Sequence, residues 1–200
     1  MQAVIQTDRL TKTFGNFTAV DAISFEVAPG EIFGFLGANG AGKTTALKML
    51  TGLLKPSQGK AFVAGYDVER YPEEVKRRIG YMSQRFSLYE DLTVRENIRF
   101  YGGIYGLSTP DIRLKTGLLL DKLQLGAQAD ALVGSLPLGW KQKLAFSVAL
   151  LHEPRIVFLD EPTSGVDPLT RRQFWDLIYE AAHQGVTLMV TTHYMDESEY

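Results

Sequence analysis

Residues 37–44 have the composition and spacing of a phosphate-binding loop. They read Gly-Ala-Asn-Gly-Ala-Gly-Lys-Thr, the G-x-x-x-x-G-K-T pattern of a loop that wraps a polyphosphate. The glycines let the backbone approach the anion closely, and the N–H groups that open the following helix point at it. An apolar run at 32–36 precedes the loop and a helical pattern at 46–50 follows it, which is the context the motif requires. The alternative, a glycine-rich turn that binds nothing, leaves Lys43 and Thr44 unexplained.

Four side chains at two places are suited to phosphoryl chemistry. Lys43 supplies a positive charge for the β- and γ-phosphates, and the Thr44 hydroxyl is placed to ligate Mg²⁺. Residues 156–159 are wholly apolar and lead into Asp160 and Glu161. Ligands of open α/β sheets bind at the carboxyl ends of the strands. We therefore expect Asp160 to hold Mg²⁺, directly or through water, and Glu161 to polarise an attacking water, unless the acids only open a loop.

Two further residues follow expected strands and can reach the same edge. His193 ends the strand expected at 186–192, from where its ring can contact a γ-phosphate. Gln84 follows the strand expected at 79–82, and its amide oxygen can serve Mg²⁺ or the attacking water. Taken alone, His193 is better explained as a structural residue, and Gln84 is weak evidence for a site. His152 and His183 lie near expected helix ends, and we interpret both as structural.

The periodicity along the chain predicts an α/β core interrupted by a mostly helical insert. Strands are expected at 3–10, 22–27, 32–36, 60–64, 79–82, 156–159 and 186–192. Helices are expected at 72–78, 91–105, 109–123 and 140–151, and a further one from the spacing of Phe174, Leu177, Ile178, Ala181 and Ala182. The helix at 91–105 is expected to begin with a capping box from Thr93 to Glu96. The helix at 109–123 is expected to have Thr109 as its N-cap and Pro110 as its first residue. The insert is expected at about 86–136.

Length and composition describe one ordinary globular domain. The chain has 200 residues, 45% hydrophobic and 22% charged, with a net charge of −2. That balance argues against a dedicated nucleic-acid binder, and no nucleic acid is expected as a partner. The absence of cysteine excludes disulfides. The sequence has neither the ~18-residue apolar run of a membrane span nor a signal peptide, so a membrane role is expected to come through a partner.

These motifs, in this order and spacing, resemble the nucleotide-binding domain of ATP-binding-cassette (ABC) ATPases over essentially the whole chain. The resemblance implies an α/β P-loop NTPase fold with a mostly parallel core sheet, an antiparallel β subdomain and a helical subdomain. The RecA-like core is then about 1–85 and 137–200. The chain also stops where the family continues, with 191–200 resembling the opening of a cut helix, so the end of the domain is expected to be missing.

The resemblance also assigns roles to individual residues. Glu161, His193 and Gln84 are implied to be catalytic, and Thr44, Gln84 and Asp160 to hold Mg²⁺. ATP is implied to bind Phe14, Gly37, Ala38, Asn39, Gly40, Ala41, Gly42, Lys43, Thr44 and Thr45. Phe14 would stack on adenine, although by itself it is an ordinary hydrophobe at a strand end. Ser164, Gly165, Val166 and Asp167 correspond to the D-loop of the family.

One segment departs from the family pattern. Where the family has Leu-Ser-Gly-Gly-Gln, this chain has Leu136, Pro137, Leu138, Gly139 and Trp140. In the family this signature contacts the γ-phosphate held by an opposing cassette. Proline offers neither a hydroxyl nor an N–H group, and leucine adds bulk where backbone approaches phosphate. We therefore expect a weakened signature, which favours a heterodimer or tandem of cassettes over a homodimer.

The function implied by the resemblance is ATP hydrolysis that drives export through a membrane permease. The Leu-Pro-Leu-Gly segment and residues 80–89 resemble second cassettes of tandem multidrug-exporter ATPases. Gln84 and the following Phe86, Ser87, Leu88 and Tyr89 are expected to contact the permease, although a core role explains their apolar character nearly as well. The expected location is peripheral, on the cytoplasmic face of a bacterial inner membrane. The alternatives are a soluble ABC ATPase acting on ribosomes or DNA, and a nucleotide sensor without turnover.

Overall fold

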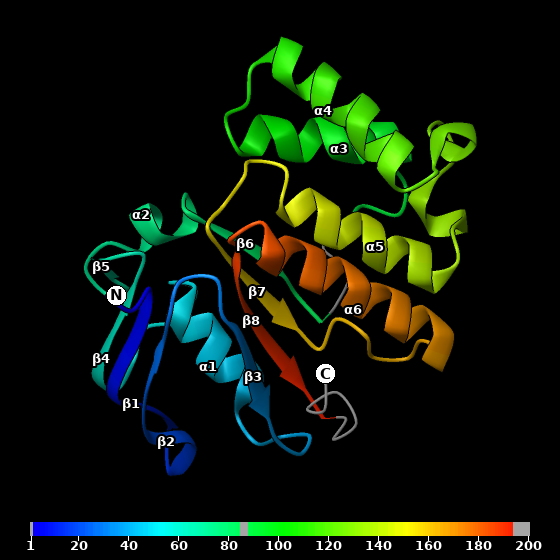
Figure 1. Ribbon diagram of the computed structural model, residues 1–200. Helices are drawn as coiled ribbons and strands as arrows, with labels where there is room; N and C mark the ends of the chain where they lie inside the picture. Colours follow the sequence, from blue (N-terminus) through cyan, green and yellow to red (C-terminus); the bar gives the residue numbers. More distant parts are fainter. Residues whose placement is uncertain (1, 85–87, 194–200) are drawn as a thin grey trace.

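The computed structural model describes residues 2–84 and 88–193 and contains two four-stranded sheets (Figure 1). The antiparallel sheet has the order β2-β1-β4-β5 and the parallel sheet the order β3-β8-β7-β6. The antiparallel strands are β1 (Ile5–Phe14), β2 (Phe17–Val27), β4 (Gln58–Val63) and β5 (Tyr66–Asp67). The parallel strands are β3 (Ile32–Leu36), β6 (Ile79–Met82), β7 (Ile156–Asp160) and β8 (Thr187–Thr192). The expected α/β class, with separate parallel and antiparallel sheets, is confirmed.

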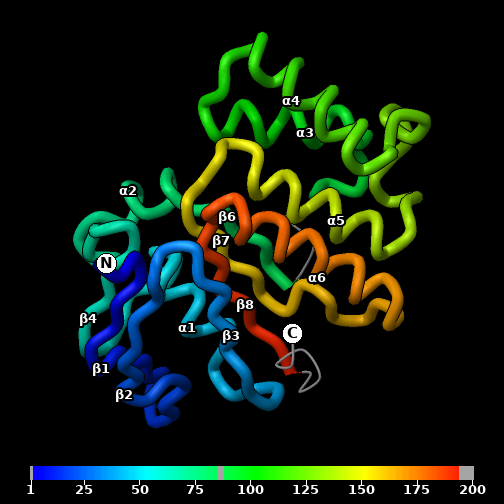
Figure 2. The backbone as a smooth tube through the Cα atoms, in the orientation of Figure 1, coloured from blue at the N-terminus to red at the C-terminus, as the bar shows by residue number. Residues whose placement is uncertain are grey.

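Six helices and two short 3₁₀ turns occupy the described residues. The helices are α1 (Lys43–Leu50), α2 (Pro72–Lys76), α3 (Val94–Ile104), α4 (Thr109–Lys122), α5 (Leu138–Ala149) and α6 (Pro168–His183). The 3₁₀ turns are Gly126–Gln128 and Val133–Ser135. The tube view shows α5 between the α3–α4 pair and α6, with α6 next to the parallel strands (Figure 2). No helix in these described ranges is long and apolar enough to span a membrane.

The two central strands are buried on both faces, as their apolar sequence predicts. Every residue of β7 and β8 is buried, because side chains alternate between the faces of a strand and both faces are covered. On one face Ile156, Phe158 and Met189 pack against α1 and the antiparallel sheet. On the other face Val157 and Leu159 pack towards α5 and α6. The carboxyl ends of the strands therefore have a fixed position.

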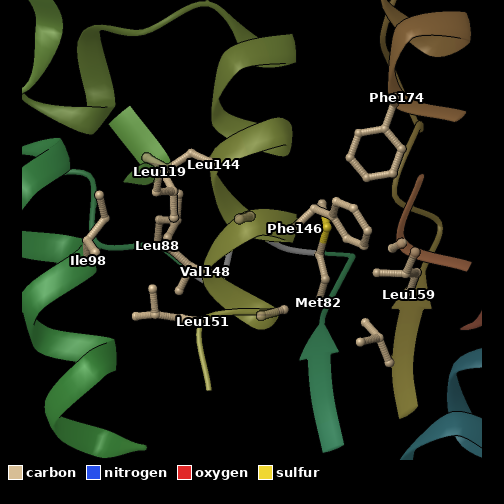
Figure 3. Close-up of a cluster of buried hydrophobic side chains, with 14 of the residues drawn as sticks. Met82, Leu88, Ile98, Leu119, Leu144, Phe146, Val148, Leu151, Leu159 and Phe174 are labelled. Carbon is tan, nitrogen blue, oxygen red and sulfur yellow. The ribbon is translucent and has the colours of Figure 1, made fainter. Parts of the chain in front are cut away.

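Helix α5 connects the helical part of the molecule to the parallel sheet. Figure 3 shows Leu144, Phe146 and Val148 of α5 between Ile98 of α3 and Leu159 of β7. All five side chains belong to one buried apolar cluster. Burying such side chains is the main favourable contribution to folding, so α3 and α4 are attached to the sheet through a continuous core. The division into core and insert remains a prediction.

Of the two predicted helix caps, the one at the start of α3 is confirmed and the one at the start of α4 is not. The capping box is confirmed: the Thr93 hydroxyl accepts a hydrogen bond from the Glu96 N–H, and the Glu96 side chain accepts one from the Thr93 N–H. The predicted N-cap at Thr109 is wrong by one residue. Ser108 caps α4 by accepting from the Asp111 N–H, which places Pro110 in the second position. Both residues can cap a helix, so the sequence did not distinguish them.

Candidate functional site

The loop between β3 and α1 closes tightly against strand β2. Gly42 is the N-cap of α1 with a φ of 85°. A Cβ atom there would lie 2.0 Å from the Ala19 carbonyl oxygen, so this position requires glycine. Gly40 also has a positive φ, of 82°. The loop therefore has glycine both where its backbone is left-handed and where it passes close to β2.

Lys43 is held at the mouth of this loop by three oxygen atoms. Its Nζ donates to the carbonyl oxygens of Gly37 at 2.6 Å and Ala38 at 3.0 Å. It also lies 3.3 Å from Glu161 Oε1. Only 4% of the Lys43 side chain is exposed. The positive charge thus lies between the loop and the end of β7.

Asp160 combines one fully bonded oxygen with one unbonded oxygen. Its Oδ1 accepts hydrogen bonds from the hydroxyls of Thr44 at 3.1 Å and Thr191 at 2.8 Å. Its Oδ2 is buried and has no hydrogen-bond partner in the described part of the chain. A buried polar atom of this kind needs an explanation. A carboxylate oxygen beside a threonine hydroxyl fits a hard cation such as Mg²⁺, which prefers oxygen ligands.

The Glu161 side chain contacts Gln84 and His193 as well as Lys43. Its Oε2 accepts a hydrogen bond from Gln84 Nε2 at 3.0 Å and lies 3.1 Å from His193 Nδ1. The carboxylate is 8% exposed. Four residues from distant parts of the chain, Lys43, Gln84, Glu161 and His193, therefore lie together at the carboxyl edge of the parallel sheet. Gln84 directs its nitrogen at Glu161, so its expected contact with Mg²⁺ stays a prediction.

Phe14 lies on a hairpin that adjoins the loop. It pairs with Phe17 across the turn between β1 and β2, and β2 carries the Ala19 carbonyl that faces Gly42. The ring is 50% exposed, and Lys12 Nζ lies 5.3 Å from its centroid. An exposed aromatic face beside a phosphate loop is available for stacking, which keeps the predicted adenine contact open.

The segment expected to be the signature, 136–140, packs against the segment expected to be the D-loop, 164–167. Pro137 is the N-cap of α5 and makes no side-chain capping bond. A Cβ atom at Gly165 would lie 3.6 Å from Leu138 Cδ2, and one at Gly139 would lie 2.3 Å from Thr170 Cγ2. Asp167 caps α6 through its side chain. The hydrogen bond from the Thr170 hydroxyl lowers the pKa of that carboxyl, which keeps the cap ionised.

The expected permease contact is only partly placed. Phe86 and Ser87 lie outside the described residues, as do residues 194–200 of the expected cut helix. Leu88 is 5% exposed and belongs to the apolar cluster, so for this residue the core interpretation is correct. Tyr89 is 48% exposed, and its ring packs edge-on against the exposed Phe100 at 5.0 Å. Tyr89 therefore remains available to a partner.

Sequence reasoning missed three residues beside these groups. Thr191 bonds to Asp160, as described above. Gln142 of α5 is buried and donates from Nε2 to the Ser164 carbonyl at 3.2 Å, which joins α5 to the loop before α6. Burial, followed by the nearby charge of Asp160, raises the pKa of Tyr81 to about 12, so its phenol stays neutral. Only Thr191 had a sequence signal, because residues two apart on a strand share a face and Thr191 precedes His193 by two.

Comparison with known proteins gives the same family at three levels. A family model described as ABC transporter matches residues 20–164. The probable multidrug ABC transporter ATP-binding protein YbhF of Escherichia coli is 51% identical over 199 residues. The Nod factor export ATP-binding protein I of Paraburkholderia xenovorans is 40% identical over 198 residues. These matches include at least 99% of this chain but span only 34% and 65% of the two relatives.

Solved structures agree with the fold. CbiO1 of Clostridium perfringens, described as part of the ABC transporter complex cbiONQ, superposes with a TM-score of 0.86 at 26% identity. That match covers 98% of this chain and 80% of CbiO1. An ATP-binding subunit of an ABC transporter gives a TM-score of 0.85 at 29% identity, covering 98% of this chain and 82% of the subunit. Since the family model covers well over half of the sequence, the chain belongs to the ABC transporter family, as one of its ATP-binding domains.

Proposed function

We propose that this chain binds and hydrolyses ATP as the cassette of an ABC transporter that exports its substrate through a membrane permease. The observation that carries the proposal is the convergence of Lys43, Gln84 and His193 on the Glu161 carboxylate. The relatives support the export direction, because their names refer to multidrug transport and Nod factor export. The transported substrate would be selected by the permease.

In this proposal each residue has a separate task in hydrolysis. Lys43 and the loop N–H groups offset the negative charge that develops on the phosphates. Glu161 accepts a proton from the attacking water, while Gln84 and His193 hold its carboxylate in place. Mg²⁺, held by Thr44 and the free oxygen of Asp160, would supply charge neutralisation at the β- and γ-phosphate oxygens. Phe14 would stack on the adenine ring.

The proposed assembly contains a second cassette, in a heterodimer or a tandem polypeptide. In a homodimer both sites would face the weakened segment at 136–140. A partner with a complete signature would instead complete the site around Lys43. In this arrangement residues 1–85 and 137–200 form the catalytic core, and 86–136 form the helical subdomain. The domain would lie against the permease on the cytoplasmic face of a bacterial inner membrane.

The test is an affinity purification of the protein from solubilised native membranes, with co-purifying proteins identified by mass. A polytopic membrane protein that co-purifies with wild type, together with ATP hydrolysis by the eluate, is the expected result. Ribosomal or DNA-bound proteins without membrane proteins would overturn the transporter assignment and favour the soluble ABC ATPase. An eluate that binds ATP without hydrolysing it would favour a sensor.

A further inference from the structure

Thr191 makes hydrogen bonds to both acidic residues of the site. It lies in β8 directly opposite Asp160 of β7 in the parallel register, and it is fully buried. Its hydroxyl donates to Asp160 Oδ1 at 2.8 Å and accepts from the Glu161 N–H at 3.0 Å. The hydroxyl thus donates its single proton to the Asp160 carboxylate and accepts, through a lone pair, the hydrogen bond from the Glu161 backbone.

The first bond fixes which oxygen of Asp160 stays free. Oδ1 receives the hydroxyls of Thr44 and Thr191, whereas Oδ2 is buried without a partner among the described residues. Hydrogen bonds to a charged acceptor are stronger than neutral ones. The Thr191 bond therefore disfavours rotation of the carboxylate and keeps Oδ2 available to a ligand.

The second bond supports a strained backbone at Glu161. This residue has a φ of 49°, in the left-handed region that non-glycine residues rarely adopt. Such strain persists only where the surroundings enforce it. The Glu161 N–H is held by both the Thr191 hydroxyl and the Thr191 carbonyl, the latter at 3.1 Å. Two residues further along the chain, just after β8, His193 contacts the carboxylate of the same glutamate, so Glu161 is held both at its backbone and at its side chain.

We propose that Thr191 is a positioning residue, which orients Asp160 for the metal and Glu161 for the attacking water. This inference rests on the proposed ATPase function. The neighbouring strand residues on the same face of the sheet are Phe158 and Met189, so apolar packing alone would accept valine at this position. The hydroxyl is therefore explained by its two hydrogen bonds rather than by the shape of the core.

The experiment compares Thr191→Val, which keeps the shape and removes the hydroxyl, with Thr191→Ser, which keeps the hydroxyl. Thr187→Val is the matched control, because Thr187 is also buried in β8 and its hydroxyl accepts from the Gly30 N–H at 2.9 Å, at the opposite end of the strand. For each purified protein we would measure kcat, KM for ATP, the free Mg²⁺ concentration at half-maximal activity, and equilibrium ATP binding with Mg²⁺ or with EDTA.

Thr191→Val is expected to lower kcat by roughly tenfold, the effect of losing about one hydrogen bond to a charged group. It should raise the half-maximal Mg²⁺ concentration and weaken ATP binding with Mg²⁺, but not with EDTA. Thr191→Ser should restore most of the kcat, of the Mg²⁺ dependence and of the ATP affinity with Mg²⁺. Thr187→Val should match wild type in all three. If Thr191→Val does not fold, Thr191→Ala against Thr191→Ser makes the same comparison.

Three outcomes are distinguishable. A Thr191→Val protein with the kcat and Mg²⁺ dependence of the Thr187→Val control would overturn the inference and leave the ATPase proposal intact. A Thr191→Ser protein as impaired as Thr191→Val would also overturn it, because shape would then matter more than the hydroxyl. A wild-type protein that does not hydrolyse ATP would overturn the proposed function itself. The Mg²⁺ dependence of ATP binding by wild type and Thr191→Val would then still test whether Thr191 orients Asp160.

Discussion

Lys43 Nζ and Glu161 Oε1 lie 3.3 Å apart, and their side chains are only 4% and 8% exposed. A buried ion pair gains little net stability, because removing both charges from water is costly. It is acceptable when the remaining donors and acceptors are also bonded. Here the carbonyls of Gly37 and Ala38 accept from Lys43, and Gln84 donates to Glu161. The pair therefore contributes orientation more than stability.

Replacing Glu161 with glutamine should separate ATP binding from hydrolysis. Glu161→Gln keeps the shape of the side chain and removes its ability to accept a proton. We expect turnover to fall by at least about 100-fold, the lower range for loss of a general base. ATP affinity should be unchanged or higher, because one negative charge near the phosphates is removed. Steady-state ATPase and equilibrium nucleotide binding measure the two effects.

The matched control for this substitution is Glu69→Gln. Glu69 pairs with Lys55 at 2.8 Å, but both side chains are largely exposed, and exposed pairs contribute little. Turnover of this variant should equal wild type. Comparable turnover of Glu161→Gln and wild type would show that another group accepts the proton.

The positions of the main site residues could be predicted because each lies just beyond the carboxyl end of a parallel strand. Glu161 and His193 directly follow β7 and β8, and Lys43 begins α1 after the loop that follows β3. Parallel strands in one sheet bring those ends to one edge, so local patterns were sufficient to expect the cluster. The buried strand β7 was equally clear, because its apolar sequence fits only a strand covered on both faces.

The hydrogen-bond partners could not be predicted in the same way. Thr191 and Asp160 are 31 residues apart, and Gln142 and the Ser164 carbonyl are 22 apart. Such bonds depend on strand register and side-chain rotamers, which leave no local pattern in the sequence. The burial of Leu88 was undecided for the same reason. Its apolar side chain fits a core and a docking surface equally, and only the packing of α3 and α5 distinguishes them.

The stacking role of Phe14 can be tested on its own hairpin. Phe14 is half exposed, so its removal should change the free energy of unfolding little. Loss of an aromatic surface for the base should weaken ATP binding by roughly tenfold in Phe14→Ala, and Phe14→Tyr should retain it. Fluorescence titration with a labelled ATP analogue measures the affinity.

Phe17→Ala provides the control for this test. Phe17 lies opposite Phe14 in the same hairpin and is 63% exposed. Its removal should leave the affinity at the wild-type value. Equal losses in both variants would indicate a general disturbance of the hairpin instead of base stacking.

His152 should make the stability of the fold depend on pH. Its ring stacks on Tyr105 with centroids 3.9 Å apart, and Nε2 lies 3.0 Å from the Ile79 carbonyl oxygen. Burial, with a smaller effect of Lys115, lowers the pKa of His152 below its usual 6.5, while the Ile79 bond opposes this. His152 in the unfolded chain therefore binds a proton more readily than His152 in the folded protein. The stability contributed by neutral His152 is complete above pH 6.5, the pKa in the unfolded chain. It is lost as the pH falls towards the lower pKa of His152 in the folded protein.

The measurement is urea unfolding of wild type and His152→Phe between pH 5 and 8. Phenylalanine keeps the stacking and removes the titration. The stability of wild type relative to this variant should be constant above pH 6.5 and decrease below it. The exposed His183, replaced by phenylalanine, controls for removal of any histidine. Parallel curves for wild type and His152→Phe would contradict a lowered pKa.

Restoring the signature should raise the activity of a homodimer. Pro137 caps α5 without a side-chain bond, so Pro137→Ser adds both a hydroxyl for phosphate and a capping group worth ~1 kcal/mol. Leu138→Gly removes bulk from the start of the helix at a propensity cost of up to ~1 kcal/mol. These two stability effects oppose each other, so a change in turnover would report on the site. We expect at least a roughly tenfold rise in the double variant, since one well-placed donor contributes that much or more to charge stabilisation.

The rise should depend on dimer formation and on Glu161, the proposed general base. ATPase measured against protein concentration should increase more steeply than linearly, because the signature would act on the nucleotide of the opposing cassette. The same double substitution combined with Glu161→Gln should remain inactive. Wild-type protein mixed with a cassette that carries a complete Leu-Ser-Gly-Gly-Gln segment should also gain activity, because the partner would then complete the site around Lys43. Unchanged turnover in the double variant would show that Pro137 and Leu138 do not limit the reaction, and the preference for a heterodimer or tandem would lose its basis.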